Sequence, residues 1–248
     1  MISALFLAAI TIVQPVPDEP PPRETVSRET VRWLMGQGDV AQVHVHREAN
    51  RELLAAPDPS AGIVLMGDSL TFHWPAEALP ALAGARIVNR GIPGQVSAQM
   101  LLRFEDDVVA LKPAAVVILA GTNDLRGSAG APTAQTEPAL RRIASNLTAM
   151  ADIADARGIS VILCAIPPVG SNQAAVARDP AAIAAANDWL RRFAGERDYI
   201  FLDYHAVLVG PDGLIDPGYT SDGLHLSRNA YLELKQALLP AMRAVVDR

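Results

Sequence analysis

This 248-residue chain has a single cysteine and no cluster of basic residues, which argues against a disulfide-bonded, a cysteine-ligated metal-binding or a nucleic-acid-binding protein. Its one cysteine, Cys164, excludes an internal disulfide bond and a cysteine-based metal site. Because Cys164 lies inside an apolar run, we expect a small core residue and not a reactive thiol. No run of Lys or Arg forms a basic stripe, and the formal net charge is −6. Nucleic acid is therefore not an expected partner.

Long apolar runs are also missing. The first thirteen residues, MISALFLAAITIV, are almost wholly apolar, and the proline-rich QPVPDEPPP that follows cannot continue a helix. This pattern predicts a signal peptide and a Pro-rich linker over residues 1–23, although no Lys or Arg precedes Arg23 and no clear cleavage site precedes Gln14. A membrane-spanning helix needs roughly 20 apolar residues. We expect no integral membrane segment, and a periplasmic or secreted protein, with a cytoplasmic one as the alternative.

The rest of the chain reads as one α/β domain over residues 24–248. Hydrophobic residues make up 50% and charged residues 19%, which is ordinary for a globular protein of this length. Short apolar runs, each followed by a turn and a helical pattern, predict five strands at residues 63–66, 86–88, 115–120, 159–166 and 199–202. Continuous apolar strands separated by helices indicate a parallel sheet buried on both faces. The expected fold is a three-layer α/β/α sandwich with a five-stranded parallel sheet, which is flavodoxin-like.

The helical period of 3.6 residues recurs between these strands. It predicts helices within residues 24–56, over 101–111 and 140–154, and from Ser227 to the C-terminal region. Each helix is expected to cover one face of the sheet.

Unusual residues follow the predicted strands, where ligands bind in open parallel sheets. The sequence GDSL at residues 67–70 follows the first strand and would hold Ser69 at the edge of the sheet, although a serine there can be a plain helix N-cap. The sequence NRGIPG at residues 89–94 follows the second strand, where glycine permits close backbone approach or simply an ordinary turn. After the third strand, GTND contains Asn123, whose amide could point into a cleft or bond its own turn.

A fourth block, SDGLHL, lies at residues 221–226. The spacing of Asp222 and His225 lets a carboxylate and an imidazole of one loop face each other. Asp222 would fix the tautomer of the ring, and the other ring nitrogen would remove the proton of Ser69. The alternative is a helix-capping loop with a surface histidine.

Together, in this order, the four blocks resemble the signature blocks of the SGNH (GDSL-type) hydrolases, over residues 60–240. The resemblance implies the SGNH hydrolase fold and a serine esterase in which Ser69 is the nucleophile and Asp222 and His225 complete a catalytic triad. It also implies an oxyanion hole formed by the N–H groups of Ser69 and Gly94 and the side-chain amide of Asn123. No metal or other cofactor is required.

One residue departs from the family pattern, because relatives often carry an acidic residue where this chain has Gln95. The hydrogen bonds that Gln95 makes in this turn are therefore not predicted by the family pattern. Among the other histidines, His44 and His46 alternate along a helical stretch without a carboxylate cluster, so we expect surface residues and not a metal pair. His73 and His205 are expected to be structural.

The expected reaction is hydrolysis of a carboxylic ester through an acyl-enzyme. Short-acyl or acetylated, carbohydrate-type esters are favoured, because no long apolar insertion could wall a tunnel for an acyl chain and aromatic residues make up only 5% of the chain. The alternatives are a lysophospholipase or acyltransferase using the same triad, or a non-catalytic carbohydrate-binding domain of this fold. The partner is then a small-molecule, glycan or lipid ester. The absence of G-x-S-x-G excludes an α/β-hydrolase, and the absence of G-x-x-x-x-G-K argues against nucleotide binding.

Overall fold

The computed structural model describes residues 38–56, 62–82, 85–130, 133–171 and 178–246. The described residues from Ala41 onward belong to one compact unit. The expected signal peptide and linker, and the part of the expected first helix before residue 38, lie outside the described residues. Within the described ranges, no helix is both long enough and apolar enough to cross a membrane.

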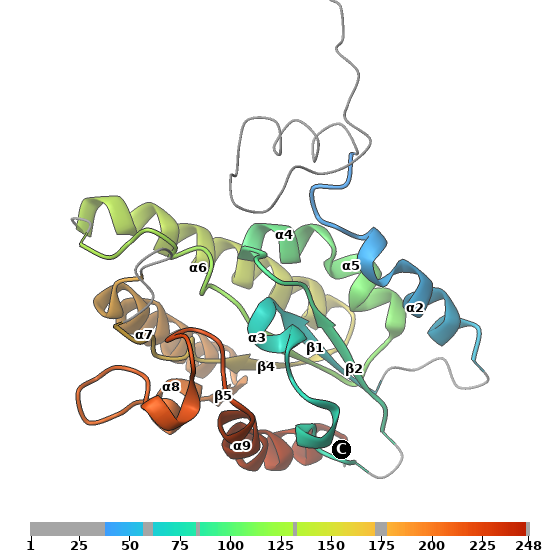
Figure 1. The fold of residues 1–248 in the computed structure, drawn as a ribbon. Coiled ribbons are helices and arrows are strands. Elements are labelled where there is room, and N and C mark those ends of the chain that lie inside the picture. Colours follow the sequence, from blue (N-terminus) through green and yellow to red (C-terminus); the bar gives the residue numbers. More distant parts are fainter. Residues whose placement is uncertain (1–37, 57–61, 83–84, 131–132, 172–177, 247–248) are drawn as a thin grey trace, which may run out of the picture. The chain divides into compact units, whose positions relative to one another are not determined.

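A five-stranded parallel sheet forms the centre of the unit (Figure 1). Its order is β2-β1-β3-β4-β5, and every neighbouring pair is parallel. The strands are β1 (Ile63–Gly67), β2 (Ile87–Gly91), β3 (Ala115–Leu119), β4 (Ser160–Cys164) and β5 (Ile200–Leu202). Every residue of β1 and β3 is buried, as expected for central strands covered on both faces. The predicted α/β/α sandwich is confirmed, with a longer second strand and a shorter fourth strand than predicted.

Helices cover both faces of the sheet. The helices are α2 (His44–Leu54), α3 (Ser69–Phe72), α4 (Ser97–Leu102), α5 (Phe104–Asp107), α6 (Thr133–Ala156), α7 (Pro180–Arg197), α8 (Tyr204–Leu208) and α9 (Arg228–Val246). Because side chains of a strand alternate between faces, Val64 of β1 packs in the core beneath α4 to α7, and Leu65 packs in the core beneath α8 and α9. Figure 1 shows α4 and α6 on one side of the strands and α9 on the other. Cys164 is buried in the second core, as predicted.

The prediction of one continuous helix over residues 101–111 is wrong. The segment consists of the end of α4, then α5, and a 3-10 turn at Val109–Leu111. The backbone leaves helical geometry at Arg103 (φ −104°, ψ 5°) and again at Val108 (φ −125°, ψ −65°). The fully buried Arg103 side chain reaches out of this segment to the carbonyl of Gly67 at 3.0 Å. A tertiary contact has overridden the local helical preference.

Two other helices differ from prediction at their ends. Among the described part of residues 24–56, only His44–Leu54 is helical. The helix predicted over residues 140–154 is longer at both ends, because α6 begins at Thr133, includes Pro138 and ends at Ala156. That helix ends before Gly158, whose positive φ of 68° suits the left-handed conformation that closes many helices.

Candidate active site

Ser69 is the first residue of α3 and lies two residues beyond the end of β1, after Asp68. Two glycines let this short helix rest on the ends of the strands. A Cβ atom on Gly67 would lie 2.0 Å from Oγ1 of Thr71, and one on Gly91 would lie 2.2 Å from the backbone N of Phe72. The close approach of these backbones fixes the position of Ser69, whose exposed fraction is 8%.

The loop before α9 brings His225 and Asp222 to Ser69. Nε2 of His225 lies 3.2 Å from Oγ of Ser69, and Nδ1 of His225 lies 2.6 Å from Oδ2 of Asp222. Oδ1 of Asp222 accepts hydrogen bonds from the backbone N–H groups of Leu224 (2.9 Å) and His225 (2.7 Å). The loop is further tied by Thr220, whose hydroxyl donates to the carbonyl of His225 at 2.8 Å. The three predicted residues therefore form a hydrogen-bonded chain from hydroxyl to carboxylate.

The electrostatics of this loop keep Asp222 ionised. Partial burial would raise the pKa of its carboxyl, but the hydrogen bonds from the ring and backbone of His225 and from Leu224 outweigh burial and lower the pKa to about 2. An ionised Asp222 favours a proton on Nδ1 of His225, which leaves Nε2 free to accept a proton from Ser69. The side chains of His225 and Asp222 are 41% and 50% exposed, so this end of the site is open.

Asn123 lies four residues beyond β3 and also reaches the Ser69 turn. Its Nδ2 donates to the carbonyl of Gln95 at 3.0 Å and to Oδ2 of Asp68 at 3.2 Å. Its Oδ1 accepts from Arg178 at 2.8 Å and, more weakly, from Arg126 at 3.4 Å. Of the two predicted arrangements, the amide is thus held mainly by residues distant in sequence and not by its own turn.

Gly94 lies in the exposed turn after β2 and has a left-handed backbone with φ of 80°. The next residue, Gln95, is buried, and its Oε1 accepts from Nε of Arg103 at 2.6 Å. Its Nε2 donates to the carbonyl of Ala41 at 2.8 Å. The charge of Arg103 is balanced by Asp107 at 2.8 Å. The neutral Gln95 therefore anchors this turn without a carboxylate at that position.

Asp68 and Arg178 are two site residues to which the sequence analysis gave no role. Asp68 is fully enclosed, and burial raises the pKa of its carboxyl to about 6, against the lowering effects of the Leu70 N–H and the charge of Arg178. Oδ1 of Asp68 accepts from Leu70 at 2.9 Å, and Oδ2 accepts from Asn123. Asp68 thus connects the Ser69 turn to Asn123.

Of the other histidines, His46 and His73 contact residues near the site. His46 corrects an expectation, because it is half-buried and its Nε2 lies 3.3 Å from the carbonyl of Gly91. Burial lowers the pKa of His46 to about 4, so this ring is neutral at neutral pH. His44 is exposed, as expected.

His73 packs edge-on against His225 with ring centroids 5.6 Å apart. His205 lies on α8, where burial lowers its pKa. In the described part of the chain, no group of three His, Cys, Asp or Glu side chains could hold a metal ion.

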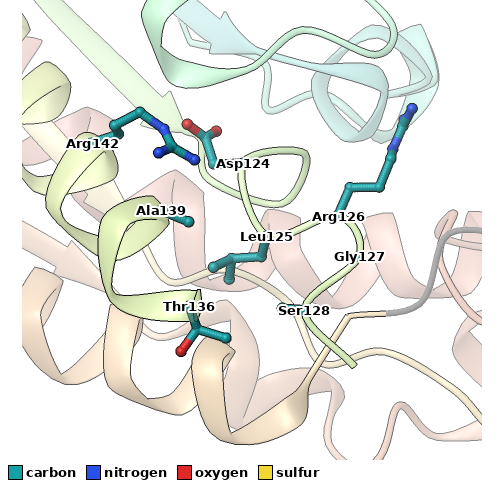
Figure 2. A pocket seen from close by; sticks show the side chains of 8 residues that line it. All are labelled: Asp124, Leu125, Arg126, Gly127, Ser128, Thr136, Ala139 and Arg142. Carbon is teal, nitrogen blue, oxygen red and sulfur yellow. The ribbon is translucent and has the colours of Figure 1, made fainter. Parts of the chain in front are cut away.

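A pocket of about 160 Å³ begins at the residue after Asn123 and lies between that loop and α6 (Figure 2). Its lining is mostly polar and comprises Asp124, Leu125, Arg126, Gly127, Ser128, Thr136, Ala139 and Arg142. Figure 2 shows Arg142 reaching toward Asp124, while Arg126 extends away from α6. Asp124 also accepts from the backbone N–H of Ser97 at 2.9 Å, which fixes the start of α4 beside the pocket.

Comparison with known proteins gives one family and many structural relatives. The model of the GDSL-like Lipase/Acylhydrolase family matches residues 65–232. A candidate acylhydrolase from Bacteroides fragilis NCTC 9343 is 29% identical with a TM-score of 0.71, covering 84% of this chain and 99% of its own. A GDSL-like lipase from Bacteroides thetaiotaomicron VPI-5482 is 28% identical with a TM-score of 0.69, covering 82% and 98%.

A more distant relative shares the fold. It is a catalytic mutant of an acetylxylan esterase from Geobacillus stearothermophilus, which is 21% identical with a TM-score of 0.57 and covers 75% of this chain and 96% of its own. No curated protein sequence matches the chain.

Proposed function

Because this chain belongs to the GDSL-like Lipase/Acylhydrolase family and is an esterase-type hydrolase, we propose that it cleaves carboxylic esters with Ser69 as nucleophile, His225 as base and Asp222 as the acid that orients the base. The observation that carries this proposal is the chain of two contacts, 3.2 Å from Ser69 Oγ to His225 Nε2 and 2.6 Å from His225 Nδ1 to Asp222 Oδ2. Ser69 begins α3 and His225 lies 156 residues later, in the loop before α9 that also carries Asp222. Their alignment matches the requirements of nucleophilic acyl transfer.

The reaction has two steps. Oγ of Ser69 attacks the ester carbonyl while Nε2 of His225 accepts the hydroxyl proton. Collapse of the tetrahedral intermediate breaks the bond to the alcohol, which takes that proton from His225. A water molecule then gives a proton to His225 and attacks the acyl-enzyme, and the carboxylic acid leaves as Ser69 regains its proton.

The negative oxygen of each intermediate needs donors near Ser69. We assign this role to the backbone N–H groups of Ser69 and Gly94 and to Nδ2 of Asn123. Nδ2 has two hydrogens, and its contact with Asp68 (3.2 Å) is longer than that with Gln95 (3.0 Å). Both hydrogens of Nδ2 are engaged in the structure, so we infer that a bound oxyanion replaces one of these two acceptors. Removing one such donor typically raises the barrier by about 2.7–4 kcal/mol.

We further propose short-acyl or acetylated, carbohydrate-type esters as substrates. The exposed His225 and Asp222 leave the site open, and the pocket beyond Asn123 is lined mostly by polar groups suited to sugar hydroxyls. A long acyl chain would need apolar wall worth about 0.8 kcal/mol per methylene. A relative of this fold is an acetylxylan esterase, and export to the periplasm or the medium would bring the enzyme to acetylated glycans.

The test compares the wild-type enzyme with Ser69→Ala. Acetate release from acetylated xylan and turnover of p-nitrophenyl acetate are measured, with fatty-acid release from lysophosphatidylcholine in parallel. Ser69→Ala removes a single hydroxyl oxygen and leaves the rest of the side chain in place at the start of α3, so it is expected to fold with a melting temperature close to that of the wild type and to lose turnover. Ser145→Ala, at an exposed serine of α6, is the matched control and is expected to stay fully active.

Two results would contradict the proposal. Turnover by Ser69→Ala near the wild-type rate would remove Ser69 from the mechanism. Fatty-acid release from lysophosphatidylcholine that exceeds acetate release would keep the triad but replace the substrate class. Ester products formed with an added alcohol would identify a transferase.

A further inference from the structure

Asn123 can serve an oxyanion only if its amide nitrogen, and not its oxygen, faces the substrate. A carboxamide has nearly the same shape after a half-turn, so its neighbours must select the orientation. On the oxygen side lies the guanidinium of Arg178, with Nη2 at 2.8 Å from Oδ1 of Asn123. A guanidinium has only donors. The flipped amide would place two donors against each other and would also set its oxygen against the acceptors of Gln95 and Asp68.

Arg178 is itself held in place. Its exposed fraction is 2%, and its Nε donates to the carbonyl of Thr122, the residue before Asn123. The next residue, Asp179, donates its N–H to Oγ of Ser128 at 2.8 Å and caps α7 through the N–H of Ala181 at 2.9 Å. The start of α7 is thereby fixed to both ends of the loop that carries Asn123, and the guanidinium cannot follow a rotating amide.

The charge of Arg178 adds to its geometry. Burial lowers the pKa of the guanidinium to about 10, with a further lowering from Arg126 and a raising effect from Asp68. Arg178 is therefore still a cation at neutral pH. A cation bonded to the amide oxygen draws electron density from the amide, which makes Nδ2 a stronger donor.

We propose that Arg178 is a positioning residue for ester hydrolysis, which acts through Asn123 by holding and polarising the amide that stabilises the oxyanion. This inference rests on the proposed function of Ser69 and Asn123. It predicts that Arg178 affects the chemical step and leaves substrate binding largely unchanged, because the guanidinium contacts the amide oxygen and lies behind the donor.

The experiment is a double-mutant cycle on p-nitrophenyl acetate with Arg178→Ala, Asn123→Ala and both together. Active sites are titrated to completion with a fluorophosphonate, and kcat is expressed per titrated site, so a fraction of misfolded protein does not alter the value. We expect Asn123→Ala to lower kcat by about 10²-fold and Arg178→Ala by about 10- to 100-fold, with KM within about twofold of wild type. The double variant is expected to match Asn123→Ala within about threefold, because Arg178 has no amide left to act on.

Three further variants make the outcome decisive. Arg178→Lys keeps the charge without the planar fork, so it is expected to fold and to give an intermediate kcat. Arg191→Met, at an exposed arginine of α7, the helix that begins two residues after Arg178, is the matched control and is expected to be unchanged in kcat. Losses that multiply in the double variant, or a loss confined to KM, would overturn the inference about Arg178. Ser69→Ala is assayed beside them. Retained turnover in Ser69→Ala would overturn the proposed function itself, whereas loss of turnover in Ser69→Ala together with multiplying losses in the double variant would overturn only the role of Arg178.

Discussion

The close packing of β2 against α3 can be tested by adding a single methyl group at Gly91. Gly91 ends β2 beneath α3, and a Cβ there would lie 2.2 Å from N of Phe72, 2.6 Å from Cα of Phe72 and 2.8 Å from C of Thr71. These are backbone atoms, so no flexible side chain can move aside. The helix that begins with Ser69 must shift instead. We predict that Gly91→Ala lowers both stability and activity.

The size of the effect follows from these distances. Non-bonded heavy atoms are comfortable at about 3.5 Å, so α3 would have to move by roughly 1 Å. Overpacking of this kind typically costs about 1–3 kcal/mol. For a domain of this size that corresponds to a fall in Tm of roughly 2–12 °C. Because a displacement of 1 Å at a reacting group can cost about 10²-fold in rate, kcat is expected to fall by that order.

The assay combines thermal unfolding with kcat on p-nitrophenyl acetate. Gly195→Ala is the matched control, because Gly195 lies on α7 and its added Cβ would meet no atom within 4 Å. That variant is expected to keep full activity and to gain up to about 1 kcal/mol from the helix preference of alanine. If Gly91→Ala kept the Tm and kcat of the wild type, the reasoning about the close packing of β2 and α3 would be refuted.

Three other predictions concern the carboxylates and the substrate. Asp222→Asn is expected to fold and to lose roughly 10³- to 10⁴-fold in kcat, because the amide no longer selects the required tautomer of His225; a loss below tenfold would contradict the triad. Burial raises the pKa of the Asp68 carboxyl from 3.8 to about 6, so the folded protein binds a proton at Asp68 more tightly than the unfolded chain does. The stabilisation that this proton gives to the folded state is complete below about pH 4 and is lost as the pH rises through about 6. The Tm of the wild type relative to Asp68→Asn is therefore expected to fall between pH 4 and pH 7, and a constant difference would show that Asp68 is not buried as described. Finally, kcat/KM is expected to be higher for p-nitrophenyl acetate and butyrate than for the octanoate and palmitate, and a continued rise to the long chains would favour a lysophospholipase.

The sheet could be predicted from sequence because buried parallel strands are short apolar runs, such as the one ending at Met66. Three of the four motifs, GDSL, NRGIPG and GTND, stand at the ends of such runs. The contact between Ser69 and His225 spans 156 residues. The residue types and the Asp-x-x-His spacing suggested it as one interpretation, and the family resemblance selected that interpretation. Local pattern alone left a plain cap or turn open at each of the two residues.

What the sequence could not supply is the polar bonding behind the site. Arg178 lies in a loop of small and polar residues with no pattern to decode, and its partner Asn123 is 55 residues away. His46 was expected on the surface because its periodicity gave no sign of a partner, yet it meets the carbonyl of Gly91. Arg103 sits within an apolar helical stripe, and its tertiary contacts end α4 there. Each of these depends on a specific long-range partner, and local propensity does not encode one.

The most direct measurement of the central claim is covalent labelling of the wild-type protein with a fluorophosphonate, followed by peptide mass spectrometry. We expect a single modified residue, Ser69, and no label in Ser69→Ala. His225→Ala is expected to be labelled at a much lower rate, because Nε2 of His225 must accept the hydroxyl proton. A label on a different serine, or equal labelling of the wild type and Ser69→Ala, would contradict the assignment of Ser69 as the nucleophile.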